Sequence, residues 1–218
     1  MRIRDRIKSD AATFKRLDKR EKMLFVWDYY RVPIIAATIV IVLVSIIMLR
    51  LGRNDTSLYV VMVNANNEVE STIIYDLLES GGVETENNYI DVETSYTLRY
   101  DDVTKTDVDT VEVLAVRFGI GDLDVFAADE AVFESYATKG AFVDLSLFIP
   151  AEILQQNEAD LYRYKNEDGH EIVGGIWIRE GSPLYEAGFY RGDALIGVAA
   201  LAQNLDNAIV LVKQILVH

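Results

Sequence analysis

The 218-residue chain contains no cysteine, only three prolines and only two histidines. The lack of cysteine excludes disulfides, thiolate zinc sites, iron–sulfur clusters, a cysteine nucleophile and a lipid anchor on an N-terminal cysteine. His170 lies in the polar stretch NEDGHE and His218 follows a helix-like run, so both are expected to be solvated surface groups. These absences exclude much of the chemistry that small enzymes use.

Sequence motifs of catalysis are also missing. The chain contains no G-x-S-x-G, no H-E-x-x-H and no P-loop. Its neighbouring acidic residues lack the twelve-residue spacing of an EF-hand, so they are attributed to acidic composition rather than to a calcium site. These acidic pairs are Asp101-Asp102, Asp122 with Asp124, and Asp129-Glu130. The sequence therefore predicts no catalytic residue, no metal site and no cofactor.

Positive charge is scarce overall and very unevenly placed. The formal net charge is −14, which argues against nucleic acid as the main partner because phosphate binding depends on Lys and Arg. Residues 1–31 nevertheless carry ten basic and five acidic side chains, whereas residues 54–218 carry nine basic and thirty acidic ones. The two ends of the chain are thus expected to face different environments.

An uncharged run, VPIIAATIVIVLVSIIML, separates these two parts between Val32 and Leu49. As a helix at about 1.5 Å per residue, its length approaches the ~30 Å hydrocarbon core of a bilayer. A buried core helix is the alternative, but such a helix seldom lacks a polar face for five turns. The sequence therefore predicts a basic cytoplasmic segment (1–31), a transmembrane helix in contact with lipid (32–51), a linker (52–57) and an extracytoplasmic domain (58–218).

Orientation follows from the charges that flank this run. Two arginines, Arg50 and Arg53, follow it, and six basic residues lie within about twenty residues before it, which predicts a cytoplasmic N-terminus. The six are Lys15, Arg16, Lys19, Arg20, Lys22 and Arg31. The chain is therefore expected to cross the cell membrane once, with its acidic part outside.

Apolar periodicity in residues 58–218 predicts an α/β domain. Strands are expected at 57–64, within 89–99 and at 123–128, with helices at 68–80, 107–118 and 128–140 between and after them. An extended segment (141–150), a short helix (152–157), a hairpin around Asp168-Gly169, a strand (194–201) and a helix (204–217) complete the domain. The alternation predicts one open, mainly parallel sheet with helices on both faces.

Four stretches carry a resemblance to a known family. They are GDLDVFAADEAVFESY (121–136), GAFVDLSLFIP (140–150), GSPLYEAGFY (181–190) and GVAALAQNLDNAIVLVKQIL (197–216). In this order the domain resembles the extracellular solute-binding proteins of bacterial ABC importers, which have the type II periplasmic-binding fold. The resemblance implies two α/β lobes that close around a ligand. Here only about forty residues separate Pro150 from the last strand, so the second lobe is expected to be missing or reduced to a hairpin.

One place in the expected sheet suits ligand binding. Ligands of open α/β sheets bind beyond the carboxyl ends of the strands, where the strand order reverses. If the first strand lies between the second and third, Asn64, Asn66, Asp129 and Glu130 line that crevice, and their amides and free N–H groups suit a polar solute or peptide. The competing interpretation is loop and helix-cap chemistry, with Asp129 as an N-cap.

Three hypotheses for function follow. The first is a membrane-anchored, non-catalytic binding or interaction module, with a membrane transporter or an envelope protein as partner. The second is an accessory substrate-binding receptor that delivers a small solute or peptide to an ABC importer. The third is a hydrolase whose carboxylates the motifs do not reveal.

Overall fold

Two compact units make up the computed structural model, residues 1–54 and residues 55–218. The structure describes residues 35, 38–42, 44–45, 56–86, 88–98, 108–166 and 169–218. The expected basic segment and most of the expected transmembrane helix and linker lie outside these described residues. Within the range 32–51, the described residues 35, 38–42 and 44–45 are helical and exposed. Among all described residues, none belongs to a helix with the length and apolar character that a membrane span requires.

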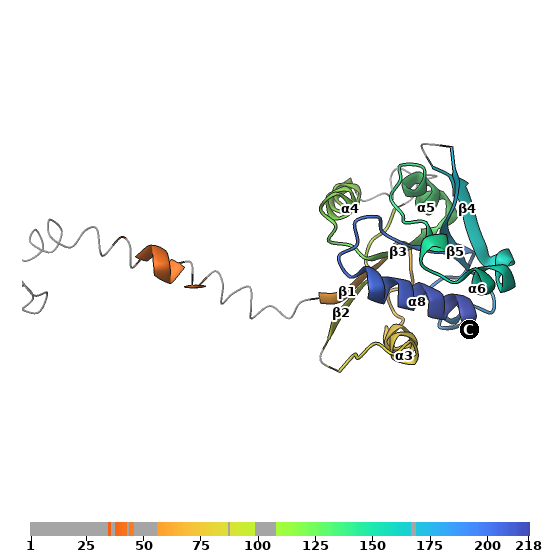
Figure 1. Ribbon diagram of the computed structural model, residues 1–218, viewed down its shortest axis with the longest axis horizontal. Coiled ribbons are helices and arrows are strands. Elements are labelled where there is room, and N and C mark those ends of the chain that lie inside the picture. Colours follow the sequence, from red (N-terminus) through yellow and green to blue (C-terminus); the bar gives the residue numbers. More distant parts are fainter. Residues whose placement is uncertain are drawn as a thin grey trace, which may run out of the picture. The chain divides into compact units, whose positions relative to one another are not determined.

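The second unit is an α/β domain built on one open, mixed sheet of six strands in the described part of the chain (Figure 1). The strands lie side by side in the order β2-β1-β3-β6-β5-β4. The strands are β1 (Thr56–Met62), β2 (Tyr89–Glu93), β3 (Val125–Asp129), β4 (Leu161–Lys165), β5 (Glu171–Ile178) and β6 (Ala194–Val198). The α-helices of this unit are α3 (Thr72–Ser80), α4 (Val108–Ile120), α5 (Glu130–Ala137), α6 (Ala151–Gln156), α7 (Pro183–Glu186) and α8 (Leu205–Val217).

The first half of the domain confirms the expected β-α-β-α-β-α order. β1 lies between β2 and β3 and runs parallel to both, which is the arrangement that the suggested crevice required. α3 is followed by Gly81 and Gly82, and Gly82 has a φ of 87°, which glycine adopts at little cost. The strand order therefore reverses between β1 and β3, which is the position where α/β sheets bind ligands.

The second half corrects the expectation of a mainly parallel sheet. β6 runs antiparallel to β3, β5 runs antiparallel to β6, and β4 runs antiparallel to β5. A parallel neighbour needs a crossover of a dozen or more residues, usually built around a helix, whereas a hairpin gives an antiparallel pair. β4 and β5 form a hairpin, and the connection from β5 to β6 holds only the one-turn helix α7. The expected hairpin is confirmed, but it extends the same sheet.

Helices cover both faces of the sheet, as the sequence predicted (Figure 1). One face packs an aliphatic core against α3 and α8, with Leu58, Val60 and Met62 of β1 at its centre. The other face packs β1 and β3 against α4 and α5, and its largest side chains are aromatic, including Phe126 and Phe133. We call these two sides the aliphatic face and the aromatic face.

Two glycines shape the aromatic face. A Cβ on Gly175 or Gly197 would lie 2.8 or 2.9 Å from the Phe133 ring, and one on Gly197 also only 2.6 Å from a backbone oxygen. The absence of side chains there lets Phe133 rest directly on β5 and β6. Its ring stacks on Phe142 at 4.2 Å and meets Tyr162 edge to face at 5.6 Å. Aromatic contacts therefore continue from the buried centre to the edge strand β4.

A buried carboxylate joins distant parts of the domain. Asp124 is 2% exposed and precedes β3. Its Oδ2 accepts hydrogen bonds from the backbone N–H of Tyr59 at 2.9 Å and from the side-chain amide of Asn204 at 2.9 Å. Its Oδ1 accepts from the backbone N–H of Asn204 at 2.8 Å. Three hydrogen bonds thus stabilise the buried Asp124 carboxylate at the point where β1, β3 and the start of α8 meet.

Candidate functional site

The predicted crevice lies beyond β1 and β3, where Asn64 meets Asp129. Asn64 follows β1 with a φ of 58°, a left-handed conformation that asparagine tolerates better than most residues. Its Oδ1 accepts from the Leu98 backbone N–H at 2.9 Å, and its Nδ2 donates to the Leu98 carbonyl at 2.6 Å. The same Nδ2 donates to Asp129 Oδ2 at 2.5 Å. The side-chain amide is therefore fully used within the chain.

Asp129 serves as the N-cap of α5. Its Oδ1 accepts from the backbone N–H of Val132 at 3.2 Å while its Oδ2 binds Asn64. The nearby Tyr190 hydroxyl donates to the Val63 carbonyl at 3.1 Å. Burial, and then the negative charge of Asp129, raise the pKa of Tyr190 well above its usual value. The structure thus brings Asn64 and Asp129, two of the four predicted residues, together. Asp129 caps α5, and Asn64 forms hydrogen bonds to Leu98 and Asp129.

The other two predicted residues, Asn66 and Glu130, interact with other parts of the domain. Asn66 forms a local turn, in which its Oδ1 accepts from the Glu68 N–H at 3.2 Å and its own N–H donates to the Phe189 carbonyl at 2.8 Å. Glu130 is exposed on the first turn of α5, and its charge acts on Tyr162. A solute bound by Asn64 and Asp129 would have to replace hydrogen bonds that already exist.

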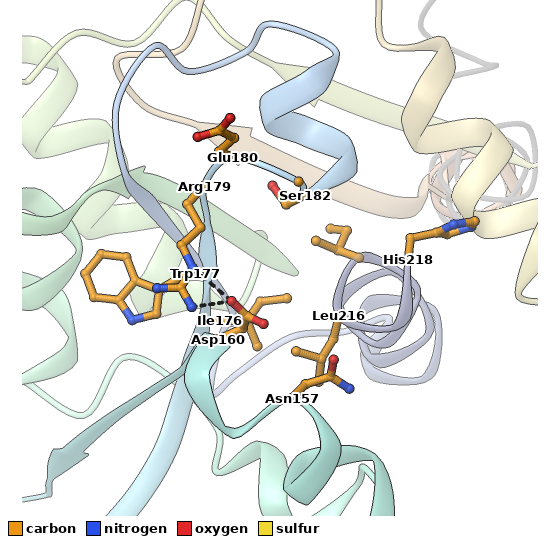
Figure 2. A pocket seen from close by; sticks show the side chains of 11 residues that line it. Asn157, Asp160, Ile176, Trp177, Arg179, Glu180, Ser182, Leu216 and His218 are labelled. Atoms are coloured by element: carbon orange, nitrogen blue, oxygen red, sulfur yellow. Dashed lines mark hydrogen bonds and ion pairs between the residues drawn. The ribbon is translucent and has the colours of Figure 1, made fainter.

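Sequence reasoning missed a cavity of about 220 Å³ between β5 and the end of α8 (Figure 2). Ile176, Ile215 and Leu216 give it an apolar wall. At its rim the Arg179 guanidinium binds Asp160, with Nε and Nη2 at 2.9 and 2.5 Å from Oδ1, and Nη2 also donates to a backbone carbonyl at 2.6 Å. A basic side chain directly after an apolar strand, in the stretch GGIWIREG, was the available signal.

The lining of this cavity suits a small amphipathic molecule. Its wall accepts apolar groups, while Arg179, Asp160 and Glu180 offer charged groups at the rim. Arg179 and Asp160 already neutralise each other, and both are more than one third exposed, so their ion pair contributes little to stability. The cavity is partly open to solvent.

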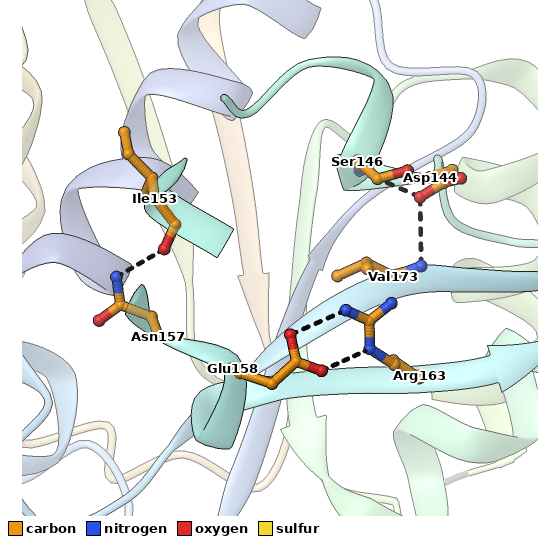
Figure 3. A network of polar contacts seen from close by, with 7 residues as sticks. All are labelled: Asp144, Ser146, Ile153, Asn157, Glu158, Arg163 and Val173. Carbon is orange, nitrogen blue, oxygen red and sulfur yellow. Dashed lines mark hydrogen bonds and ion pairs between the residues drawn. The ribbon is translucent and has the colours of Figure 1, made fainter. Parts of the chain in front are cut away.

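A polar network fixes the neighbouring hairpin to the rest of the domain (Figure 3). Asp144 Oδ1 accepts from the backbone N–H groups of Ser146 and Val173 at 3.0 and 3.1 Å, which ties the loop after α5 to β5. Arg163 on β4 binds Glu158 through two hydrogen bonds of 3.1 and 3.0 Å. The Asp144 bonds therefore connect β5 to the preceding loop, whereas the exposed Arg163–Glu158 pair joins β4 only to the turn just before it and contributes little to stability.

Three partly exposed rings cover the aromatic face where β4 and β5 reach the sheet edge. Tyr162 lies 6.0 Å from both Tyr164 and Trp177, measured between ring centroids. Burial, and then the charges of Glu134 and Glu130, raise the pKa of Tyr162 to about 12. We call these three rings and the two glutamates the acidic aromatic surface. Sequence analysis placed Glu130 in the crevice and assigned no role to the other four residues.

Within the described ranges, no group of three or more His, Asp or Glu side chains is arranged to hold a metal ion. His170 is exposed beside the β4–β5 turn, and its backbone N–H donates to Asn166 Oδ1 at 2.9 Å. His218 borders the cavity described above. No protein-family model, curated protein or solved structure matches this chain.

Proposed function

We propose that residues 56–218 form a non-catalytic binding module and that residues 32–51 anchor it in the cell membrane as a single helix. The observation that carries this proposal is the uncharged run from Val32 to Leu49, which separates a basic segment from an acidic one. Because the positive charges precede the run, the N-terminus lies in the cytoplasm and the α/β unit outside. The compactness of residues 55–218 as a unit of their own supports this division.

The binding module is proposed to correspond to one lobe of a type II periplasmic-binding protein. The order β2-β1-β3 supports this, because it creates the reversal point that ligand-binding α/β sheets use. In the described residues after Pro150, all three strands join the same sheet. A single lobe offers an open surface rather than a closing cleft, which favours an interaction module that contacts a transporter or an envelope protein.

The membrane anchor is tested by alkaline extraction of membranes and by protease treatment of intact cells that express the chain with a tag at each end. The full chain is expected in the extracted membrane pellet, with only the C-terminal tag accessible to protease. Replacing Ile39 and Val42 with lysine is expected to release the protein from the pellet, since a charge at the centre of a span costs about 2.5–3.5 kcal/mol. The matched control is the Ile39→Leu, Val42→Leu variant. A parent chain found full length in the soluble fraction contradicts the proposal.

The cavity beside Arg179 favours a second candidate, an accessory receptor that delivers a small solute or peptide to an importer. A pocket of about 220 Å³ with an apolar wall and a charged rim suits a molecule of amino-acid size. Thermal-shift measurements with amino acids, sugars and short peptides test it, because a ligand at 100 times its Kd stabilises a protein by about 2.7 kcal/mol. Stabilisation that Leu216→Trp abolishes supports the receptor, and no stabilisation by any compound contradicts it.

A further inference from the structure

The acidic aromatic surface combines three partly buried rings with two exposed carboxylates that form no ion pair with a described residue. Tyr162 and Tyr164 lie on β4, and Trp177 lies on β5 with its ring nearly perpendicular to that of Tyr162, at an interplanar angle of 80°. All three rings are only partly buried. In the described part of the chain, the helices α4 and α5 of this face contact the aromatic core over β1, β3 and β6. The rings thus mark where helical cover ends.

The geometry of α5 places two carboxylates beside these rings. Glu130 and Glu134 are four residues apart and so lie on one exposed side of the helix, and Phe133, three residues after Glu130, lies next to them on the buried side. Phe133 contacts Tyr162 edge to face at 5.6 Å, so the flanking glutamates lie at the border of the ring surface. Both glutamates are exposed, and neither forms an ion pair with a described residue.

Most basic side chains close to this surface interact with other groups of the domain. Arg163 alternates with the two tyrosines along β4 and binds Glu158. Arg179 binds Asp160. Lys139 lies 5.7 Å from the ring of Tyr136. Lys165 follows Tyr164 on β4 and, like Arg163, lies on the opposite side of the strand from the two tyrosines. The surface is therefore rich in aromatic rings and negative charge, and no ion pair joins its glutamates to a described basic residue.

The same domain already contains a filled version of this arrangement. The Arg117 guanidinium lies 4.7 Å from the centre of the Tyr59 ring and binds the Asp122 carboxylate at 3.0 Å. A guanidinium between an aromatic face and a carboxylate gains a cation–π contact and a charge-assisted hydrogen bond. The acidic aromatic surface offers these partners without the cation.

We propose that the acidic aromatic surface binds Lys or Arg side chains of an extended, basic segment of a partner protein. Charge complementarity favours such a partner, because the surrounding residues 54–218 carry thirty acidic and nine basic side chains. An extended segment fits because β4 ends the sheet, so among the described residues no strand pairs with its outer side, and that side offers backbone hydrogen bonds to an added strand. The proposal specifies the partner of the binding module and so rests on the proposed function.

The test uses the full chain purified in detergent and a fluorescent decapeptide of alternating lysine and valine, with binding followed by fluorescence polarisation. The parent is expected to bind this peptide and not the same peptide with acetylated lysines. The Glu130→Gln, Glu134→Gln double variant is expected to lose about tenfold in affinity, and Trp177→Leu about threefold to tenfold, in line with a cation–π contact of ~0.5–2 kcal/mol.

Two controls separate this surface from the general acidity of the domain. Glu70→Gln combined with Glu152→Gln removes two exposed carboxylates elsewhere, and is expected to change the affinity less than twofold. Trp177→Leu leaves every charge in place, so its loss of affinity reports the ring surface alone. Circular dichroism and the thermal midpoint of each variant verify that it is folded.

Several results overturn the proposal. They are equal affinity of the double glutamine variant and its control, unchanged binding by Trp177→Leu, and absence of peptide binding by the parent. Equally tight binding of tetramethylammonium at the same residues also overturns it, since a small cation is then the occupant. Extraction of membranes tests the anchor independently, so a chain that stays in the pellet without binding the peptide refutes only this inference.

Discussion

The two faces of the sheet are built from different side chains and end differently. On the aliphatic face, α3 and α8 pack against each other and bury a core of mostly Leu, Ile and Val. On the aromatic face, α4 and α5 cover a chain of rings that continues past them to partly exposed tyrosines and a tryptophan. The aliphatic face is therefore a covered core, whereas the aromatic face has both a core and a partly exposed border.

Helix α4 adds to the accessible character of the aromatic side. Leu114 and Thr110 are buried, but Val116 and Ile120 are 58% and 65% exposed. Val116 and Ile120 are four residues apart and so share one exposed side of α4. Variants on this exposed side should therefore change stability less than variants in the core.

The largest effect is expected at the centre of each face. Phe133→Ala removes a ring that contacts Phe142, Tyr162 and two glycines, and is expected to cost about 3–5 kcal/mol of unfolding free energy. Leu211→Ala, on the aliphatic face, is expected to cost about 2–4 kcal/mol. Urea unfolding of the full chain in detergent measures both. A cost below 1 kcal/mol for Phe133→Ala contradicts a packed aromatic face.

The next effect concerns the glycine that supports Phe133. Gly197→Ala places a Cβ 2.6 Å from a backbone oxygen and 2.9 Å from the ring, so it is expected to destabilise the protein by about 1–3 kcal/mol. Gly192→Ala is the matched control, because a Cβ there meets nothing within 4 Å. The difference between their urea midpoints is the measurement. Equal midpoints show that the ring does not rest on β6.

A smaller effect is expected from pH at the border of the aromatic face. The pKa of Tyr162 is raised to about 12, so between about pH 10 and 12 the folded protein holds a proton that the unfolded chain releases. Stability from this group is complete below about pH 10 and falls as pH rises through that window. Tyr162→Phe is expected to flatten the decline of the thermal midpoint. An unchanged slope shows that Tyr162 is solvated like a free tyrosine.

The smallest effect on stability is expected at the exposed side of α4. Val116→Lys replaces an exposed apolar side chain and is expected to change the unfolding free energy by less than about 0.5 kcal/mol. The matched substitution Leu114→Lys, on the buried side of the same helix, is expected to unfold the protein. Thermal midpoints measure both. Marked destabilisation by Val116→Lys shows that this side of α4 is covered.

Local patterns predicted the elements well because apolar spacing and glycine stops act within a few residues. The strand of Val125–Asp129, the cap at Asp129 and the final helix Leu205–Val217 followed directly from sequence. The direction of β6 did not, because it depends on which neighbour the strand pairs with rather than on its own residues. Apolar spacing predicted a helix at 107–118 but does not decide which side of α4 is buried: Leu114 is buried, whereas Val111 is 39% exposed, since apolar residues surround most of this helix.

The candidate site was predicted only in part. The sequence placed Asn64 and Asp129 together only on the condition that the first strand lies between the second and third, and it did not show their mutual hydrogen bond or the bonds to Leu98. The acidic aromatic surface joins Glu130 and Glu134 to residues about thirty to forty-five positions later in the chain. Such a surface arises from hairpin placement, which periodicity alone does not determine.

The buried carboxylate of Asp124 has a consequence for the order in which the chain matures. Its hydrogen-bond donors lie 65 residues earlier, at Tyr59, and 80 residues later, at Asn204. Contacts of such long sequence separation close late and slow the folding of a domain. During synthesis, the bond from Tyr59 can form once Asp124 has emerged, but this carboxylate keeps unfilled acceptor sites until Asn204 has been added about 80 residues later.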